Sequence, residues 1–286
     1  MIWLSVLTLT AITILLATLL VLARRFLHVE DDPRIDEVEA LLPHVNCGAC
    51  GYPGCRAFAE ALVQQQAQPV QCTVSSATGH SAIAHLLGVP VGSQEKRVAR
   101  LACAGGNNVA PRRAVYTGLQ TCRAAATVSG GGKACAWGCL GFGDCAKACT
   151  FDALHMNAND LPIVAESKCT ACGDCVRACP KDLFSIHPVS HQLWVACKNQ
   201  EMGDNVLAEC EVACTACGRC ALDAPKVISM HNNLPVVNYL ISEQSPLATA
   251  RCPTGAIVWI ATDGNILKGA AAKPIVRTTP LAGMAT

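Results

Sequence analysis

The stretch CTACGDCVRACP, residues 169–180, places four cysteines at the spacing C-x2-C-x2-C-x3-C and follows the last one with a proline. In bacterial ferredoxins with two [4Fe–4S] clusters, the first three cysteines of such a run bind one cluster and the fourth binds the other. The soft iron of a sulfide cluster favours thiolates, and the short spacing lets one loop present three of them. This stretch therefore predicts one half of a ferredoxin-like module and requires a second cysteine run.

A looser run lies upstream, with the spacing C-x3-C-x5-C-x3-C, at Cys135, Cys139, Cys145 and Cys149. Exchange of the fourth ligands between the two runs gives two predicted clusters. One is expected at Cys135, Cys139, Cys145 and Cys179, and the other at Cys149, Cys169, Cys172 and Cys175. Zinc bound by the same cysteine pairs is the alternative, but eight cysteines that include a complete run favour iron and sulfide. The wide spacing of the upstream run leaves its exact ligands open.

The pattern recurs downstream in an incomplete form. CTACGRCALDAP, residues 214–225, repeats the first three cysteines but ends in Ala-Pro instead of Cys-Pro. When LPIV (161–164) is aligned with LPVV (234–237), the Cys-Pro pair at 179 falls on the Cys-Pro pair at 252. The chain therefore contains an internal repeat of the ferredoxin-like module.

The losses in this second copy fall on a single cluster. Ser242, Ser245 and Ala248 occupy its three loop positions, and Ala224 occupies the fourth when two residues are deleted between the modules. Every ligand of the neighbouring cluster is present, at Cys214, Cys217, Cys220 and Cys252. Random decay would not sort the losses in this way, so the sequence predicts a degenerate module that keeps one [4Fe–4S] cluster.

A further group of cysteines lies nearer the N-terminus, in CGACGYPGC, residues 47–55. Its glycines allow a tight loop that brings the backbone close to sulfur. Four cysteines with no histidine at ligand spacing predict a fourth [4Fe–4S] cluster, with zinc as the alternative. The expected ligands are Cys47, Cys50, Cys55 and Cys72.

Four cysteines remain outside these sets, at Cys103, Cys122, Cys197 and Cys210. The segments LACAGG and VACKNQ around two of them look alike, which leaves open a further metal site shared by the two halves. Plain buried thiols are the favoured interpretation, because free cysteine packs as a small hydrophobe. Cys210 is also a competing ligand for the 214–220 loop.

The N-terminal segment from Ile2 to Ala23 carries no charge and is long enough to span a bilayer. A signal peptide would carry positive charge before the apolar run, whereas here Arg24 and Arg25 follow it. We therefore expect a retained single-pass anchor in the inner, cytoplasmic membrane, with the bulk of the chain in the cytoplasm. That compartment is reducing, which disfavours disulfides as the role of the twenty cysteines.

The expected fold class is α+β: a transmembrane helix, a small helical [4Fe–4S] domain and tandem bacterial-ferredoxin-like modules. The expected boundaries are an anchor at 1–26, a linker and four-cysteine domain at 27–90, a mixed segment with the two-cluster module at 91–190, the degenerate module at 191–265 and a flexible tail at 266–286. The formal net charge of +1 gives no electrostatic case for nucleic acid. No nucleophile–base constellation, Walker loop or dinucleotide fingerprint is present, so no catalytic residue and no NAD site are expected in this chain.

In their order, the apolar segment, CGACGYPGCRAFAEAL, CLGFGDC, CTACGDCVRACP and CPTGAI resemble the B subunit of Rnf complexes, which are membrane ion-translocating ferredoxin:NAD oxidoreductases. The resemblance extends to about residue 262. It implies that soluble ferredoxin exchanges electrons with this subunit, which relays them to neighbouring subunits that hold the flavins, the NAD site and the ion path. Members with a complete last pair of runs would carry one more cluster than is expected here.

Other functions are weighed against this one. An iron–sulfur component of another membrane redox complex uses the same motifs. A corrinoid-linked iron–sulfur protein shares a similar N-terminal cluster domain, but it needs a large barrel and a cobalamin-binding domain that do not fit in this chain. An iron–sulfur sensor needs a DNA- or partner-binding module, and no basic recognition helix is visible in the sequence.

Overall fold

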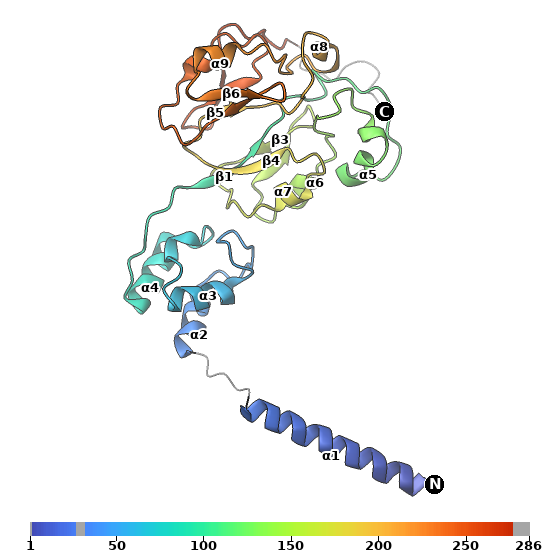
Figure 1. Cartoon of the computed structure of the whole chain (residues 1–286), viewed down its shortest axis with the longest axis vertical. Coiled ribbons are helices and arrows are strands. Elements are labelled where there is room, and N and C mark those ends of the chain that lie inside the picture. The colour runs from blue at the N-terminus through green and yellow to red at the C-terminus, as the bar shows by residue number, and fades with distance from the viewer. Residues whose placement is uncertain (1, 27–31, 277–286) are drawn as a thin grey trace. The chain divides into compact units, whose positions relative to one another are not determined.

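The computed structural model describes residues 2–26 and 32–276, which form two compact units (Figure 1). Unit 1 consists of Met1–Asn46, Tyr52–Pro69 and Ser75–Val91, and unit 2 of Cys47–Gly51, Val70–Val74 and Gly92–Thr286. The chain is a mixture of short helices and short strands, as the sequence predicts. Residues 27–31, at the start of the predicted linker and four-cysteine domain (27–90), and the last ten residues of the predicted tail lie outside the described residues.

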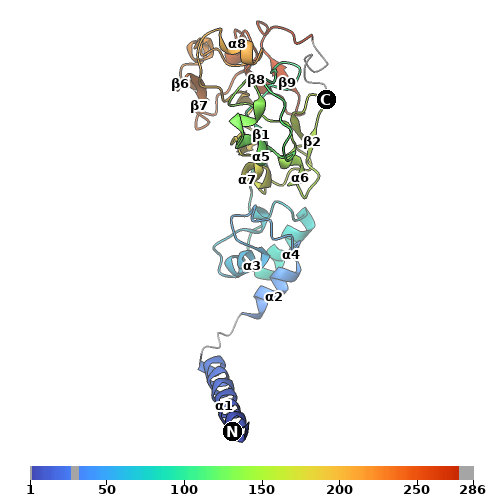
Figure 2. The same cartoon turned by 90° about the vertical axis from the view of Figure 1, so that its right-hand side faces the viewer.

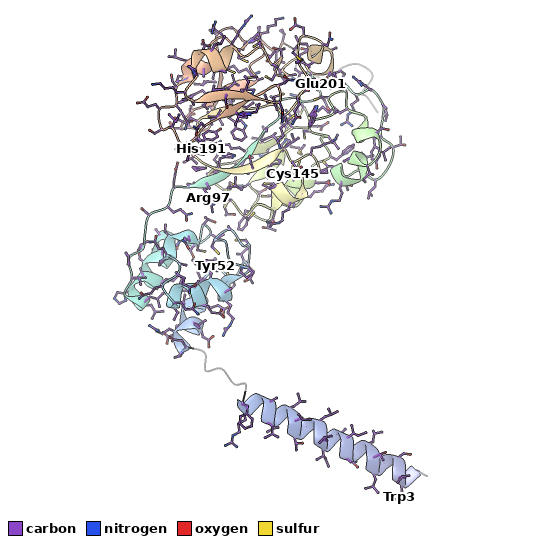
Figure 3. The ribbon with its side chains drawn as sticks, in the orientation of Figure 1. Trp3, Tyr52, Arg97, Cys145, His191 and Glu201 are labelled. Carbon is purple, nitrogen blue, oxygen red and sulfur yellow. The ribbon has the colours of Figure 1, made fainter. Side chains whose placement is uncertain are left out.

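Unit 1 begins with the long helix α1 (Ile2–Phe26), whose apolar part, Trp3–Ala23, has a mean hydropathy of 2.6. Within the described part of the chain it is the one helix long and apolar enough to cross a membrane. Its apolar side chains, Trp3 among them, project from the helix and are exposed (Figure 3). Its threonine hydroxyls each donate to a carbonyl three or four residues earlier, at Thr8, Thr10, Thr13 and Thr18. Such internal pairing of polar groups is what an apolar solvent demands.

The rest of unit 1 is a small helical body made of α2 (Pro33–Ala40), α3 (Cys55–Val63) and α4 (Ala77–Leu87). Helix α4 starts where the Ser76 hydroxyl accepts from the Gly79 amide, and it ends at Gly88 in the left-handed conformation. The helices bury Val38, Phe58 and Ile83 among themselves. This buried core holds together a unit that has no strand among its described residues.

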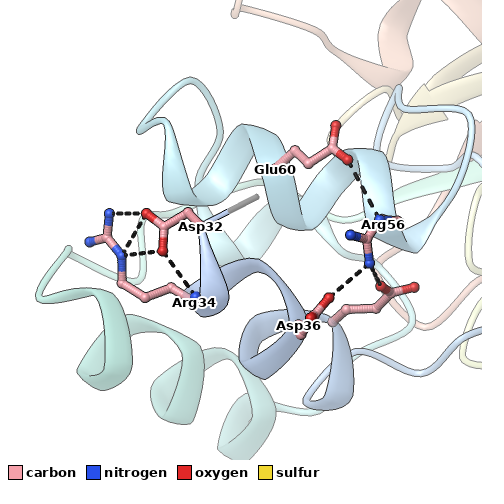
Figure 4. Close-up of polar contacts among 6 residues, drawn as sticks. Asp32, Arg34, Asp36, Arg56 and Glu60 are labelled. Atoms are coloured by element: carbon pink, nitrogen blue, oxygen red, sulfur yellow. Dashed lines mark hydrogen bonds and ion pairs between the residues drawn. The ribbon is translucent and has the colours of Figure 1, made fainter. Parts of the chain in front are cut away.

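Ion pairs link α2 to α3 on the surface of unit 1 (Figure 4). Arg56 of α3 lies 2.9 Å from the carboxylate of Asp36 and 3.0 Å from that of Glu39, both on α2, and 3.8 Å from Glu60 on its own helix. Exposed pairs of this kind contribute little each. They orient the helix that begins at Cys55.

Unit 2 opens with strand β1 (Arg97–Leu101), which pairs in antiparallel fashion with β4 (Phe184–Pro188). Between them lie α5 (Cys122–Ala126), the 3-10 helix η2 (Ser129–Gly132), α6 (Asp144–Lys147), the hairpin β2 (Leu154–Met156) and β3 (Pro162–Val164), and α7 (Asp174–Ala178). Helices α6 and α7 lie side by side in both views (Figures 1 and 2). The mixed segment before the cysteine runs thus supplies a strand to the first module.

The second half of unit 2 contains a three-stranded sheet in the order β5 (Leu193–Val195), β8 (Ile257–Ile260) and β9 (Ile266–Lys268). It also contains α8 (Val206–Glu209), α9 (Arg219–Asp223), the hairpin β6 (Ile228–His231) and β7 (Leu234–Val237), and the 3-10 helix η3 (Pro246–Thr249). The prediction of a flexible tail from residue 266 is wrong for β9, because its backbone pairs with β8. The sequence does not predict this strand, because it is only three residues long and contains a charged lysine.

Two hairpins occupy the positions that the aligned LPIV and LPVV segments assign to them. In each, the aligned segment is the second strand: β3 in the first half and β7 in the second. The helix α7, which carries Cys175, corresponds to η3, which carries Ala248. The two halves therefore share a local plan while differing in the cysteines that it carries.

Candidate metal centres

Three cysteine loops of unit 2 share one backbone feature, a glycine in the left-handed conformation directly before a helix. Gly143, Gly173 and Gly218 have φ of 76°, 83° and 71° and stand directly before α6, α7 and α9. A left-handed residue turns the chain sharply into each helix, and glycine takes this conformation without steric cost. Two residues after each glycine comes a predicted ligand, at Cys145, Cys175 and Cys220. The device fixes the third cysteine of each loop at the start of a helix.

Three of the ligands predicted for the complete run share one core. Cys175 is buried there with Phe184 and Leu154, and the partly buried Cys149 and Cys169 pack against it. The Cys169 sulfur accepts from the Ala99 amide at 3.4 Å, and the Cys149 sulfur accepts from the Ala153 amide at 3.4 Å. Hydrogen bonds of this type from backbone to sulfur orient metal-binding thiolates and tune their electronics.

Burial dominates the electrostatics of this run. Burial, together with repulsion from the nearby Cys169 and Cys172, raises the pKa of Cys175 to about 12. Without metal, a thiol of this kind stays protonated at neutral pH. Iron must displace that proton, so ligand binding and proton release are coupled.

The upstream run is divided by the structure. Cys139, Cys145 and Cys179 line one cavity, and the fourth cysteine of that lining is Cys122. Cys135, which the spacing assigned to this set, lines a different cavity. The physical reason is the position of α5, where the Arg123 amide donates to the Asp144 carboxylate at 3.1 Å and brings the start of α5 beside α6.

The sequence holds a signal for this arrangement that spacing alone did not reveal. When CLGFGDC (139–145) is aligned with CTACGDC (169–175), the first and last cysteines coincide and Phe142 falls on Cys172. The 139–145 loop therefore lacks its middle ligand. Cys122, from another segment, lines the cavity beside this loop.

The second half of unit 2 brings its four predicted ligands to one cavity. That cavity is lined by Cys214, Cys217, Cys220 and Cys252. Burial raises the pKa of Cys214 to about 11, with smaller contributions from repulsion by the other three thiols. Two of the substituted positions, Ala224 and Ala248, pack in an apolar core with Leu193 and Ile228.

Each unit contains part of the N-terminal cysteine group. In unit 1 the Cys55 amide donates to the Asn46 side chain at 2.8 Å, and Gly54 lies so close to Asn46 that a Cβ would meet its oxygen at 2.9 Å. In unit 2 the loop with Cys47 and Cys50 turns at Gly51, whose φ is 91°. These contacts fix the loop locally.

A third cavity of this kind lies in unit 2. It too is lined by four cysteines, at Cys103, Cys135, Cys197 and Cys210. Three of these belong to the group that the sequence left without a role. The favoured interpretation of those three as isolated buried thiols does not account for this convergence.

The donor sets fit clusters better than bare ions. Three cavities of unit 2 are each lined by four cysteines. Thiols that surround a space, and not a point, match a cube of iron and sulfide.

Known proteins share these features. A family described as "Putative Fe-S cluster" matches residues 42–74, and the "4Fe-4S binding domain" family matches residues 162–184. The chain is 39% identical over 239 residues to the B subunit of the Na(+)-translocating ferredoxin:NAD(+) oxidoreductase complex of Acetobacterium woodii, an alignment that covers 83% of this chain and 72% of that protein. It is also 39% identical over 252 residues to the B subunit of the proton-translocating complex of Clostridium ljungdahlii (87% and 89%). The B subunit of the ion-translocating oxidoreductase complex of Methanosarcina acetivorans is 38% identical over 208 residues (73% and 79%).

Proposed function

Because this chain belongs to the family of B subunits of Rnf-type ion-translocating ferredoxin:NAD oxidoreductases, we propose that its clusters receive electrons from a soluble ferredoxin. The family makes it an iron–sulfur electron-transfer subunit of a multi-subunit, membrane-associated oxidoreductase. The sequence resemblance suggested the same family. Beyond the family, we propose the electron donor, the cluster ligands and the orientation of the chain in the membrane.

The observation that carries the ligand proposal is the gathering of four cysteines around each cavity. Cys122 takes the place that spacing gave to Cys135. The four proposed sets are Cys47, Cys50, Cys55 and Cys72; Cys149, Cys169, Cys172 and Cys175; Cys122, Cys139, Cys145 and Cys179; and Cys214, Cys217, Cys220 and Cys252. The first set rests on spacing and on the family match to residues 42–74.

When bound, each cluster supplies one-electron transfer: it accepts one electron and later gives one up, with no change in its ligands. The chain supplies the thiolates, the hydrogen bonds to sulfur and the exclusion of water. None of these tasks needs an acid–base side chain. This agrees with the absence of a catalytic constellation from the sequence.

Contacts within unit 2 support an order of neighbouring sites. The Thr73 hydroxyl donates to the Thr170 carbonyl at 2.6 Å, so the residue after Cys72 contacts the residue after Cys169. Cys145 also contributes to the electrostatic environment of Cys175. We infer that the N-terminal set, the complete run and the Cys122 set follow one another in space.

The proposed domains are the anchor, the four-cysteine domain and two tandem modules, of which the last is degenerate. The hairpins β2–β3 and β6–β7 support the tandem plan. Helix α1 is proposed as a single-pass anchor that leaves the clusters in the cytoplasm, since Arg24 and Arg25 follow its apolar part. A reporter fused to the C-terminus should then be active only inside the cell, and activity outside would contradict this orientation.

The donor is tested with the full chain purified in detergent without oxygen. Reduced bacterial-type ferredoxin should bleach the visible absorbance of the clusters and produce the EPR signals of reduced cubes. Oxidised ferredoxin is the control and should do neither. If dithionite reduces the clusters but reduced ferredoxin does not, the proposal of ferredoxin as donor is wrong.

A further inference from the structure

The cavity lined by Cys103, Cys135, Cys197 and Cys210 has no role in the four centres above. Its thiols come from four separate segments: one follows β1, one precedes the 139–145 loop, one follows β5 and one ends α8. Like the two cavities assigned to clusters, it is lined by four cysteines. No local sequence motif brings these residues together, so their meeting is a product of the fold.

Backbone amides point at the sulfurs of this cavity. The Cys103 sulfur accepts from Gly105 at 3.4 Å and from Cys139 at 3.5 Å. The Cys197 sulfur accepts from Asn199 and Cys214, each at 3.4 Å. A neutral thiol is a weak acceptor, whereas a metal-bound thiolate uses such bonds fully. The pattern matches that at Cys149 and Cys169 in the complete run.

A buried cation lies on the same wall. Lys133 is only 6% exposed, lines the cavity, and donates to the carbonyls of Gly105 and Cys139. Among the described residues it has no carboxylate partner. A buried ammonium needs nearby negative charge. Four thiolates around a cube of iron and sulfide would provide it.

Close packing at Gly105 also marks the site. A Cβ at this position would lie 3.0 Å from the Cys210 sulfur and 3.7 Å from the Cys103 sulfur. The backbone thus runs between two of the thiols, where only glycine fits without displacing a sulfur. This is the close approach of backbone to ligand that the cysteine loops of unit 2 also need.

We propose that Cys103, Cys135, Cys197 and Cys210 bind a fifth [4Fe–4S] cluster. Together with the four proposed sets, this accounts for all twenty cysteines of the chain in sets of four. The inference rests on those ligand sets, in particular on the exchange of Cys135 for Cys122, and not on the identity of the electron donor.

The fifth site lies between the two modules. One of its sulfurs is hydrogen-bonded to the amide of Cys139, a ligand in the first module, and another to the amide of Cys214, a ligand in the degenerate module. Without it, these two centres would be joined only through protein that carries no metal. With it, the centres of unit 2 form a continuous series.

The test is the metal content of the full chain, purified in detergent without oxygen. Five cubes give about twenty irons and about twenty sulfides per chain, and four cubes give about sixteen of each. The double variant Cys197→Ala/Cys210→Ala should lose about four irons and one reduced-state EPR signal. Val212→Ala changes the lining of the same cavity without removing a thiol, and it should keep the iron content of the unmodified chain.

Two single variants test the exchange of ligands. Cys135→Ala should remove the same EPR signal as the double variant, while Cys122→Ala should remove a different one. If the double variant does not fold, Cys210→Ser replaces it, since serine keeps the volume but is a poor iron ligand.

About sixteen irons in the unmodified chain, unchanged iron in the double variant, or zinc in place of the lost iron would each overturn the fifth cluster. Reduction of the remaining clusters by ferredoxin would then still stand, so the two proposals fail separately.

Discussion

The two halves of unit 2 fill their cores with different side chains. In the first half, the core between the hairpin and the short helices contains five cysteines, at Cys145, Cys149, Cys169, Cys175 and Cys179, around Leu154 and Phe184. In the second half, the corresponding core contains Leu193, Ile228, Val237, Ala248 and Ile257, with only Cys220 and Cys252 at its edge. Apolar side chains in the second half thus lie where the first half has cysteines, and under the proposed ligand sets they take the place of one cluster.

The comparison predicts that the first half depends on its metal. Cys175→Ala should abolish the cluster at the complete run, with a loss of about four irons, because three thiols no longer hold the cube. Folding energy supplied by metal binding is lost with it, so the midpoint of thermal unfolding should fall further than in a variant that leaves the clusters intact. Iron analysis and calorimetry measure both effects, and Cys175→Ala with full iron content would contradict the comparison.

The second half should depend on its apolar core. Leu193 is fully buried there and lines none of the cysteine cavities. Leu193→Ala should lower the free energy of unfolding by about 2–5 kcal/mol through lost burial and the cavity left behind. The iron content should not change. Leu222→Ala, on the exposed face of α9, is the matched control and should alter neither quantity.

Ser242 and Ser245 align with ligand positions of the first half, and we expect them to affect only the local backbone and no cluster. The Ser245 hydroxyl accepts from the Leu247 amide and caps η3, whereas Ser242 is exposed. Ser245→Ala should cost about 1 kcal/mol, as for other lost caps, with no loss of iron. Ser242→Ala should be silent in urea unfolding and in iron analysis. Loss of iron in either variant would show that the serines still serve a cluster.

The smallest effect is expected where the two halves meet. His187 lies 3.0 Å from His191 between their Nδ1 atoms, and His191 stacks on Tyr239 of the second half. Burial lowers the pKa of His187 below its usual value of 6.5, and repulsion from His191 and Arg100 lowers it further. Burial also lowers the pKa of His191, against the opposing attraction of Glu95.

Both histidines are therefore neutral in the folded protein. Their contribution to the free energy of unfolding is complete above the usual histidine pKa of 6.5 and is lost as the pH falls below it. The unfolding midpoint should drop modestly between about pH 7.5 and about pH 5.5. In His187→Gln this pH-dependent part should be smaller. An identical pH profile in the variant would show that the junction does not titrate, because acid damage to the clusters is common to both proteins.

The sequence predicts what is local and misses what is assembled from a distance. The complete run at 169–180 and the incomplete one at 214–220 could be interpreted from spacing, because each loop makes its own turn at Gly173 or Gly218. Cys122 and Cys135 could not be assigned in this way. Each lies close to the 139–145 loop in the chain, and only the packing of α5 against α6 decides which one faces it.

The same limit applies to strands. Strand β1 joins β4 across a long stretch of chain, and β9 is three residues long, so neither has a countable periodic pattern. The apolar N-terminal helix is the opposite case, because its length and composition alone define it. Elements whose own residues carry a sequence pattern can be predicted, whereas strands that form only by pairing with another segment cannot.

The wide separation of Cys103 and Cys210 along the chain has a consequence for how the protein matures. The proposed set of Cys149, Cys169, Cys172 and Cys175 closes over only 26 residues (149 to 175), so all of its ligands are made within a short stretch of synthesis. The cavity shared by the two modules closes only after more than a hundred residues have been made and both modules have docked, and long-range closure is the slow part of folding. Loading of that cavity would then come last and would report that the whole of unit 2 has been built correctly.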